Sequence, residues 1–233
     1  MIENNIHSLI QNIKLIISDV DGVLTDGKIL IDSNGIESKF FNVEDGTGSA
    51  LAYYANLPIA LISGRYSKST EIRSKELNIK YCFQGCLNKV EKLNDLLKIY
   101  SLDYHEVAYI GDSLVDIPVM KLVGFPITVP DSHPLNKKYA SYVTKKSGGD
   151  GVLFEVVEKI LMIQDTYDKV IRKMSSVYPI DISDLYLLED DCENGIKIMR
   201  SKESINTSRV FSRINKNEIK TPYYEYRDTA MSN

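Results

Sequence analysis

Three aspartates fall within eleven residues near the N-terminus, in the stretch ISDVDGVLTDG at 17–27. Asp19, Asp21 and Asp26 follow directly on an apolar run, and like charges this close oppose one another's ionisation. A bound cation, a reaction or a surface turn would each account for the crowding. Carboxylates are ligands for hard cations such as Mg²⁺, and an aspartate can also attack phosphorus as a nucleophile. The cluster is therefore typical of phosphoryl chemistry, which requires further groups.

Polar and charged residues of the required kinds follow the other apolar runs of the chain. They are Ser63, Gly64, Arg65, Lys89, Asp112 and Asp116. In open α/β sheets, ligands bind at the carboxyl ends of the strands, so we expect these groups to share one edge. Hydrolysis of a phosphate monoester needs a nucleophile, neutralisation of the phosphoryl charge and a proton for the leaving alcohol. The set meets these needs.

The residue types suggest a role for each group. Asp19 can form an aspartyl-phosphate, while Asp21 can protonate the leaving oxygen and then activate water. Ser63 and Lys89 are placed to hold the phosphoryl oxygens, helped by free N–H groups of the turn at Gly22. The clustered carboxylates predict a Mg²⁺ site that stabilises the transferring group.

The elements that must position these groups alternate between apolar runs and amphipathic stretches. Strands are expected at 14–18, 59–63, 80–84, 107–111, 125–129 and 141–144. Helices are expected at 46–55, 67–77, 88–99, 114–122 and 151–163. Continuous apolar strands separated by helices indicate parallel strands covered on both faces. The fold class is therefore α/β, a doubly wound, Rossmann-like parallel sheet.

A β-hairpin is expected after the first strand, where a helix would otherwise stand. Two strand-like runs within 27–41 flank Ser33-Asn34-Gly35, and Asn-Gly is a strong hairpin signal. This flap, at 28–41, would lie beside the aspartates.

The sequence predicts an N-terminal extension at 1–13, a phosphatase domain at 14–165 and a partly flexible extension of unknown fold at 166–233. Its last stretch, 220–233, is typical of a mobile end.

Composition excludes several classes of function. The chain has 233 residues, 43% of them hydrophobic and 26% charged, and its net charge is −4. Neither a nucleic-acid footprint nor a polybasic membrane patch is indicated. We expect no signal peptide and no membrane span. The three cysteines, Cys82, Cys86 and Cys192, are interpreted as structural thiols in a reducing cytoplasm.

The ordered motifs resemble those of the haloacid-dehalogenase-like phosphatases. Within residues 14–164 they read DVDGVLTDG, FNVEDGTG, ISGR, FQG, VAYIGDSLVDIPVM, VGFPITVPDSHP, YVTKKSGGDGV and FEVV. The match is closest to the members that act on 3-deoxy-2-keto sugar acid phosphates. The resemblance implies hydrolysis of 3-deoxy-D-manno-octulosonate 8-phosphate in lipopolysaccharide biosynthesis, with Mg²⁺ as cofactor and without a large cap domain. It also implies a homotetramer in which the hairpins pack together and a neighbouring subunit covers each site.

The resemblance carries roles onto matching positions. It makes Asp19 the nucleophile and Asp21 the general acid/base, and assigns Mg²⁺ to Asp19, the backbone carbonyl of Asp21, and Asp112. Ser63, Gly64 and Lys89 would hold the phosphoryl group, and Asp116 would support Lys89 or the metal's waters. Thr25, Asp26 and Arg65 would lie near the sugar acid, where an Arg guanidinium suits a carboxylate.

Three departures from the family pattern leave alternatives open. Ser113 stands where the family commonly has Asp, and Asp150 and Phe154 stand where it often has Arg. A differently shaped sugar pocket would suit a nonulosonate (sialic-acid type) 9-phosphate, and a non-catalytic oligomerisation or regulatory module is the alternative of another class.

Individual residues also have plainer interpretations. Asp116 could begin a helix, Arg65 could be a surface cation, and Thr25 and Asp26 could only shape the hairpin. Lys92 competes with Lys89 for the role of the phosphate-binding cation.

Overall fold

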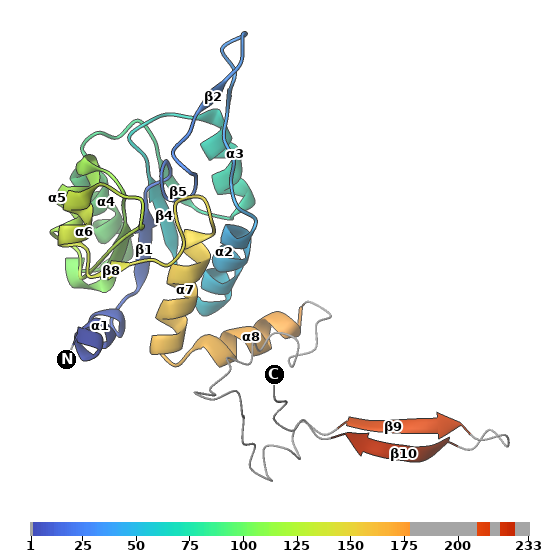
Figure 1. Cartoon of the computed structure of the whole chain (residues 1–233). Helices are drawn as coiled ribbons and strands as arrows, with labels where there is room; N and C mark the ends of the chain where they lie inside the picture. The colour runs from blue at the N-terminus through green and yellow to red at the C-terminus, as the bar shows by residue number, and fades with distance from the viewer. Residues whose placement is uncertain (1, 178–208, 215–219, 227–233) are drawn as a thin grey trace. The chain divides into compact units, whose positions relative to one another are not determined.

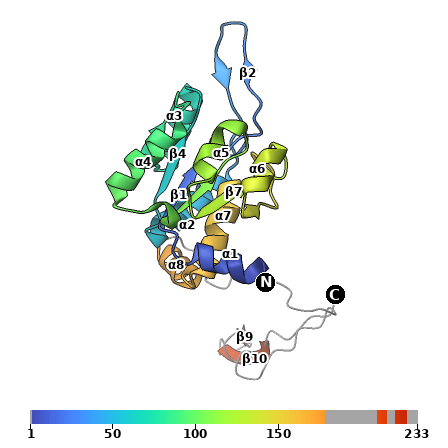
Figure 2. The same cartoon turned by 90° about the vertical axis from the view of Figure 1, so that its left-hand side faces the viewer.

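The computed structural model describes residues 2–177, 209–214 and 220–226 (Figures 1 and 2). The chain divides into two compact units, residues 1–182 and 183–233, and each is described by itself. The first unit holds the sheet and all the candidate site residues. Cys192 lies outside the described residues, as do residues 178–208, 215–219 and 227–233 of the predicted C-terminal extension.

A six-stranded parallel sheet forms the centre of the first unit, in the order β5-β4-β1-β6-β7-β8. The strands are β1 (Leu15–Ser18), β4 (Ile59–Ile62), β5 (Tyr81–Phe83), β6 (Val107–Ile110), β7 (Phe125–Thr128) and β8 (Tyr142–Val143). Every residue of β1, β4, β6 and β7 is buried, as expected of strands covered on both faces. Ser18 pairs with Leu61 on one side and with Ile110 on the other, so the three central strands end together. The predicted fold class is confirmed.

Helices cover both faces of the sheet (Figure 1). They are α2 (Glu44–Ala55), α3 (Lys68–Glu76), α4 (Lys89–Tyr100), α5 (Ile117–Met120), α6 (Pro134–Tyr139) and α7 (Val152–Ile163). On one face, Leu93 and Leu96 of α4 and Met120 of α5 pack with Leu15 and Ile17 of β1. On the other face, α2 and α7 pack against each other.

The helix expected at 114–122 is split in two. A 3₁₀ turn, η2 (Leu114–Asp116), precedes α5, and a second 3₁₀ turn, η1 (Tyr104–Glu106), leads into β6. Pro118 has no N–H to donate, so it is tolerated only in the first turn of an α-helix, and α5 starts at Ile117. No helix was expected at α6, whose Pro134 likewise lies in its first turn, next to the capping side chain of His133.

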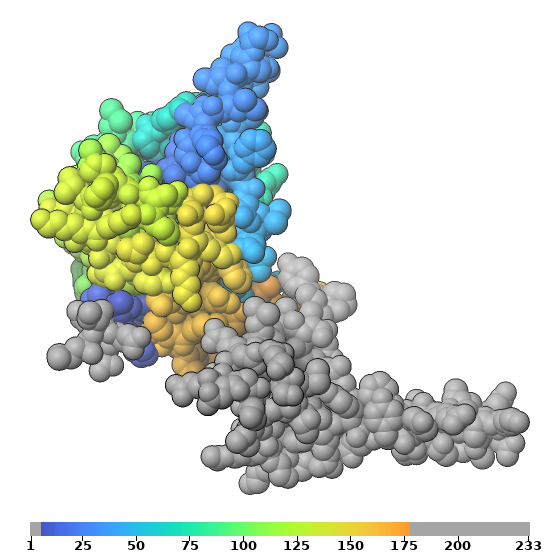
Figure 3. All heavy atoms as spheres, viewed as in Figure 1, coloured from blue at the N-terminus to red at the C-terminus, as the bar shows by residue number. Residues whose placement is uncertain are grey.

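The hairpin after β1 is present, with β2 (Leu30–Ile31) antiparallel to β3 (Glu37–Ser38). The Asp32 carboxylate accepts hydrogen bonds from the N–H groups of Asn34 and Ile36, and Gly35 has a φ of +78° that other residues rarely adopt. Figure 3 shows this flap standing out from the surface of the first unit.

Two further helices enlarge the first unit beyond the predicted limits of 14 and 165. The side-chain amide of Gln164 donates to the carbonyls of Ile10 and Ile13, which ties α1 (Ile2–Ile10) to the end of α7. The amphipathic helix α8 (Tyr167–Ser175) buries Val170, Ile171 and Met174. None of the helices within the described residues is long and apolar enough to cross a membrane.

The described part of the second unit is an antiparallel pair, β9 (Arg209–Ile214) and β10 (Lys220–Tyr226). No strand was predicted at 209–214 or 220–226, and the expectation of a mobile end at 220–233 stays a prediction. The pairing shifts register between Pro222 and Tyr224, and a bulge is one of the few places where a strand accommodates proline. Because proline is unusual inside a strand, Pro222 argued against a strand at 220–226.

We predict that Gly48→Ala destabilises the protein. A Cβ at Gly48 would lie 2.6 Å from the Cα of Phe154, so α2 and α7 would have to separate. The expected loss is about 1–3 kcal/mol in the free energy of unfolding, measured by denaturant titration. Gly46→Ala in the same helix is the control, because its Cβ meets nothing closer than 3.9 Å. Equal stability of the two variants would contradict the prediction.

Candidate active site

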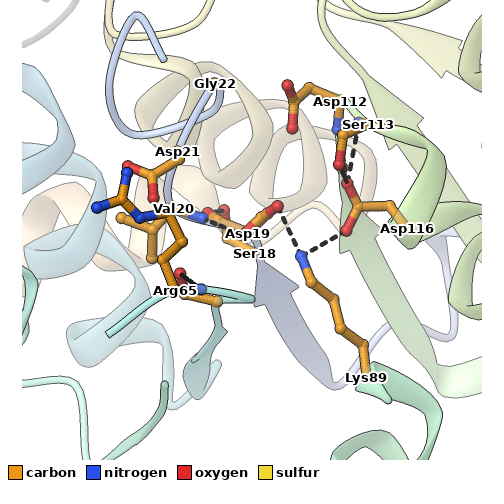
Figure 4. A network of polar contacts seen from close by, with 12 residues as sticks. Ser18, Asp19, Val20, Asp21, Gly22, Arg65, Lys89, Asp112, Ser113 and Asp116 are labelled. Atoms are coloured by element: carbon orange, nitrogen blue, oxygen red, sulfur yellow. Dashed lines mark hydrogen bonds and ion pairs between the residues drawn. The ribbon is translucent and has the colours of Figure 1, made fainter. Parts of the chain in front are cut away.

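A buried ammonium group lies at the centre of the site (Figure 4). Lys89, the first residue of α4, places its Nζ 2.6 Å from Oδ2 of Asp19 and 2.7 Å from Oδ1 of Asp116. The Lys89 side chain is 1% exposed, so this charge depends on its two partners for stabilisation. Although burial opposes the charge, Asp19 and Asp116 raise the pKa of Lys89 above its ordinary value. Lys92 instead pairs with Glu91 and Asp95, so Lys89 is the lysine in the site.

Asp116 has both carboxylate oxygens occupied by protein donors. Oδ1 accepts from Lys89 and from the Tyr109 hydroxyl at 2.6 Å. Oδ2 accepts from the N–H of Asp112, and from the N–H and hydroxyl of Ser113. Asp116 therefore ends the 3₁₀ turn and directly precedes α5, and it also holds Lys89. With its oxygens so engaged, it fits a supporting role better than that of a metal ligand.

Asp112 offers the free oxygen that Asp116 lacks. Its Oδ1 is buried and has no hydrogen-bond partner among the described residues. One carboxylate oxygen from each of Asp19, Asp112 and Asp116 lies within 4.8 Å of the others, so positions 19 and 112 face a common point. A Cβ at Gly22, whose φ is +87°, would lie 2.1 Å from Oδ2 of Asp112. Only glycine at position 22 lets the loop after β1 approach Asp112 this closely.

The electrostatics of the cluster favour a cation. Burial and the nearby Asp116 raise the pKa of Asp19 to about 7, against the opposing effect of Lys89. Burial, Asp19 and Asp116 likewise raise the pKa of Asp112 to about 7. Three carboxylates and one ammonium leave two net negative charges when all are ionised. An unpartnered buried oxygen and this charge fit a hard divalent ion such as Mg²⁺.

Ser63 and Gly64 follow β4, the strand next to β1, at the same edge of the sheet. The Ser63 side chain is buried, and its hydroxyl accepts a hydrogen bond from the N–H of Arg65 at 3.3 Å. Gly64 has open space around it, since a Cβ there would meet nothing within 4 Å. The two residues thus form a backbone turn beside Asp19 with room for a ligand.

Thr25 and Asp26 lie near the aspartate loop but are engaged locally. Thr25 is fully buried, and its hydroxyl accepts from the N–H groups of Gly22 and Gly27. Asp26 accepts from the backbone and the ammonium of Lys28. These contacts favour the interpretation that both residues shape the start of the hairpin. Arg65 is 46% exposed and pairs with Glu37 of β3 at 2.7 Å.

The three departures from the family pattern have separate structural settings. Ser113 caps η2, since its N–H and hydroxyl donate to the Asp116 carboxylate. Asp150 is exposed. The Lys146 ammonium lies 5.5 Å from the centre of the Phe154 ring and also pairs with Glu44. A positive charge is therefore present beside Phe154, although it comes from a different residue than the expected Arg.

Sequence reasoning missed three residues of the site, Tyr109, Lys39 and Glu37. Tyr109 is hidden in an apolar strand, where alternation alone suggests a core residue. The Lys39 ammonium lies 2.6 Å from Oδ1 of Asp21, the other aspartate of the loop, and 3.6 Å from Glu37. The sequence signal that could have identified Glu37 and Lys39 is their opposite charge and their spacing of two residues, on a hairpin already expected beside the aspartates.

Comparison with known proteins agrees with this arrangement. The profile of the haloacid dehalogenase-like hydrolases matches residues 60–156. With its parallel sheet and its aspartates at the carboxyl edge, the first unit is a haloacid dehalogenase-like hydrolase.

Closer relatives narrow this class. The 3-deoxy-D-manno-octulosonate 8-phosphate phosphatase of Salmonella typhi is 44% identical over 159 residues, 68% of this chain and 85% of that protein. The crystal structure of the Yersinia pestis phosphatase is 40% identical with a TM-score of 0.69, covering 71% of this chain and 89% of that one. The Moraxella catarrhalis phosphatase, solved with magnesium, phosphate and KDO, is 37% identical with a TM-score of 0.71, covering 73% and 98%. The chain therefore belongs to the family of the 3-deoxy-D-manno-octulosonate 8-phosphate phosphatases.

We predict that Mg²⁺ binds more weakly as the pH falls through about 7. Protons compete with the metal for Asp19 and Asp112, whose pKa values are raised to about 7. The dissociation constant, measured by calorimetry, should be about tenfold or more higher at about pH 6 than at about pH 8. Asp112→Asn should abolish binding, whereas Asp95→Asn on the exposed side of α4 should not. Unchanged affinity in Asp112→Asn would place the metal elsewhere.

Proposed function

We propose that the protein hydrolyses 3-deoxy-D-manno-octulosonate 8-phosphate with Mg²⁺, through an aspartyl-phosphate on Asp19. The observation that carries this proposal is the position of Asp19, held by the buried Lys89 ammonium at 2.6 Å and within reach of Asp112. Membership of the phosphatase family, at 44% identity to the Salmonella typhi enzyme, supports the substrate. Nothing in the comparisons favours the nonulosonate 9-phosphate alternative or a non-catalytic module.

Each step of the reaction is assigned to a group of this chain. Asp19 attacks phosphorus and the bond to the sugar oxygen breaks, while Asp21 gives a proton to that oxygen. Asp21 then takes a proton from water, which cleaves the aspartyl-phosphate. Lys89 and the Ser63-Gly64 turn hold the phosphoryl oxygens, and Asp116 keeps Lys89 in place.

Asp19, Asp112 and the backbone carbonyl of Asp21 would hold Mg²⁺. The unpartnered Oδ1 of Asp112 supports this assignment. When bound, Mg²⁺ supplies charge neutralisation for the phosphoryl group. The two net negative charges of the cluster would otherwise repel the substrate.

The sugar acid is assigned to the neighbourhood of Arg65, at the base of the flap. Arg65 is the candidate partner of the substrate carboxylate, since a guanidinium can bind both oxygens, and it is partly exposed. Lys146 beside Phe154 is a second cation for the same polyanionic ligand.

Phosphate release from a substrate panel tests this function. Wild-type protein should hydrolyse 3-deoxy-D-manno-octulosonate 8-phosphate only with Mg²⁺, and Asp19→Asn should lower kcat by roughly 10³-fold or more because covalent chemistry is lost. Asp95→Asn is the matched aspartate control. Comparable kcat/KM values for eight- and nine-carbon substrates would remove the substrate assignment, and no turnover of either would remove the function.

We also infer a cytoplasmic homotetramer assembled through the flaps. Leu30, Ile31, Ile36 and Phe40 of the hairpin region are 57–77% exposed, an apolar surface of the kind that marks an interface. The free, half-buried Cys82 and Cys86 suit a reducing compartment.

Ile31→Asp should dissociate the assembly, because it places a charge in the apolar contact between flaps. Sedimentation velocity should then report a smaller species, together with lower activity if a neighbouring subunit covers the site. Ile99→Asp on α4, at a comparably exposed position away from the flap, is the control. A wild-type protein that sediments as a monomer would overturn the inference.

A further inference from the structure

Lys39 is unusual among the lysines of the flap because its side chain is 0% exposed. It follows directly on β3, in a hairpin whose apolar side chains are largely exposed. Lys28, at the start of the same hairpin, is by contrast 85% exposed. A long cationic side chain buried on a projecting hairpin needs compensating partners, since burying an unpaired charge is costly.

The principal partner of Lys39 is Asp21, the second aspartate of the loop after β1. The Lys39 ammonium donates to Oδ1 of Asp21 at 2.6 Å and to the Thr70 hydroxyl of α3 at 3.4 Å. Oδ2 of Asp21 is buried and has no hydrogen-bond partner among the described residues. One oxygen of Asp21 is thus held and the other is free.

Further contacts hold the base of the flap in place around this pair. Glu37 lies 3.6 Å from the Lys39 ammonium through Oε1 and 2.7 Å from the Arg65 guanidinium through Oε2. The Ser69 hydroxyl of α3 donates to the Glu37 carbonyl at 3.3 Å. The flap is therefore joined to α3 and to the loop after β4 at the point where Lys39 meets Asp21.

We propose that Lys39 is a positioning residue for Asp21. It holds the carboxyl group by Oδ1, which leaves Oδ2 available to the leaving sugar oxygen. This inference rests on the proposed phosphatase function, in which Asp21 is the general acid. In that step the Asp19–phosphorus bond forms, the phosphorus–sugar oxygen bond breaks, and the Asp21 proton goes to the sugar oxygen.

The role predicts a dependence on the leaving group. A sugar alkoxide is a poor leaving group and needs the Asp21 proton, whereas p-nitrophenolate leaves without one. Because kcat/KM covers only the steps up to release of the alcohol, it reports the acid role separately from the later attack of water. General acid catalysis contributes about 10²–10⁴-fold to a reaction rate, and a misplaced acid loses part of this rate enhancement.

The experiment compares Lys39→Met with wild type on 3-deoxy-D-manno-octulosonate 8-phosphate and on p-nitrophenyl phosphate. We expect kcat/KM to fall about 10–100-fold on the sugar phosphate and less than about threefold on the aryl phosphate. Lys75→Met, an exposed lysine of α3, is the control that leaves both values unchanged. In an Asp21→Asn background, adding Lys39→Met should lower kcat/KM on the sugar phosphate little further, because the effect of Lys39 passes through Asp21.

The outcomes separate this inference from the function on which it rests. Equal losses on both substrates, or a full additional loss in the Asp21→Asn background, overturn the positioning role while the phosphatase function stands. A wild type that hydrolyses neither substrate removes both. If Lys39→Met does not fold, Lys39→Arg serves instead. It keeps the charge but moves the donor, and should show a smaller loss, again confined to the sugar phosphate.

Discussion

The site depends on one buried interaction, the contact of the Lys89 ammonium with Asp19 and Asp116. A lysine that is 1% exposed keeps its charge only because two carboxylates flank it. The same contact helps to orient Asp19, whose other carboxylate oxygen accepts from the N–H of Val20 at 2.7 Å. Asp116 can serve as the anchor since Tyr109 and the turn after β6 satisfy its remaining hydrogen-bonding capacity. Removing either carboxylate would leave the buried Lys89 ammonium with one carboxylate partner instead of two.

The fold creates the charge crowding that this interaction only partly relieves. Three parallel strands end in register, so their loops bring Asp19 and Asp112 to one place. The close approach at Gly22 presses the first loop against Asp112, and a buried oxygen of Asp112 is left without a partner. Such an arrangement stores electrostatic repulsion in the free protein, and binding of a divalent cation relieves it. The same negative charge that attracts a divalent cation would repel a phosphoryl group until that cation is bound.

The flap contributes side chains that contact the loops after β1 and β4. Between β1 and the crossover helix α2, the chain forms a hairpin whose base brings Lys39 and Glu37 into contact with Asp21 and Arg65. Its outer apolar residues remain exposed in the single chain, which is consistent with a surface that is covered only on assembly. Under the proposed function, this one small element would both border the sugar and join subunits.

Much of this protein could be inferred from local sequence. Apolar runs and their spacing determined the six strands and the parallel sheet, because burial on both faces leaves an uninterrupted hydrophobic signal. The residues following each run determined the candidate set at the carboxyl edge, from Asp19 to Asp116, because that edge is where the loops meet. Tertiary structure alone decided the partners: that Asp116 binds Lys89, that Asp112 keeps a free oxygen, that Thr25 turns inward, and that Lys39 reaches Asp21. Side chains 18 to 27 residues apart meet only when loops fold over the sheet, and sequence spacing does not encode those distances.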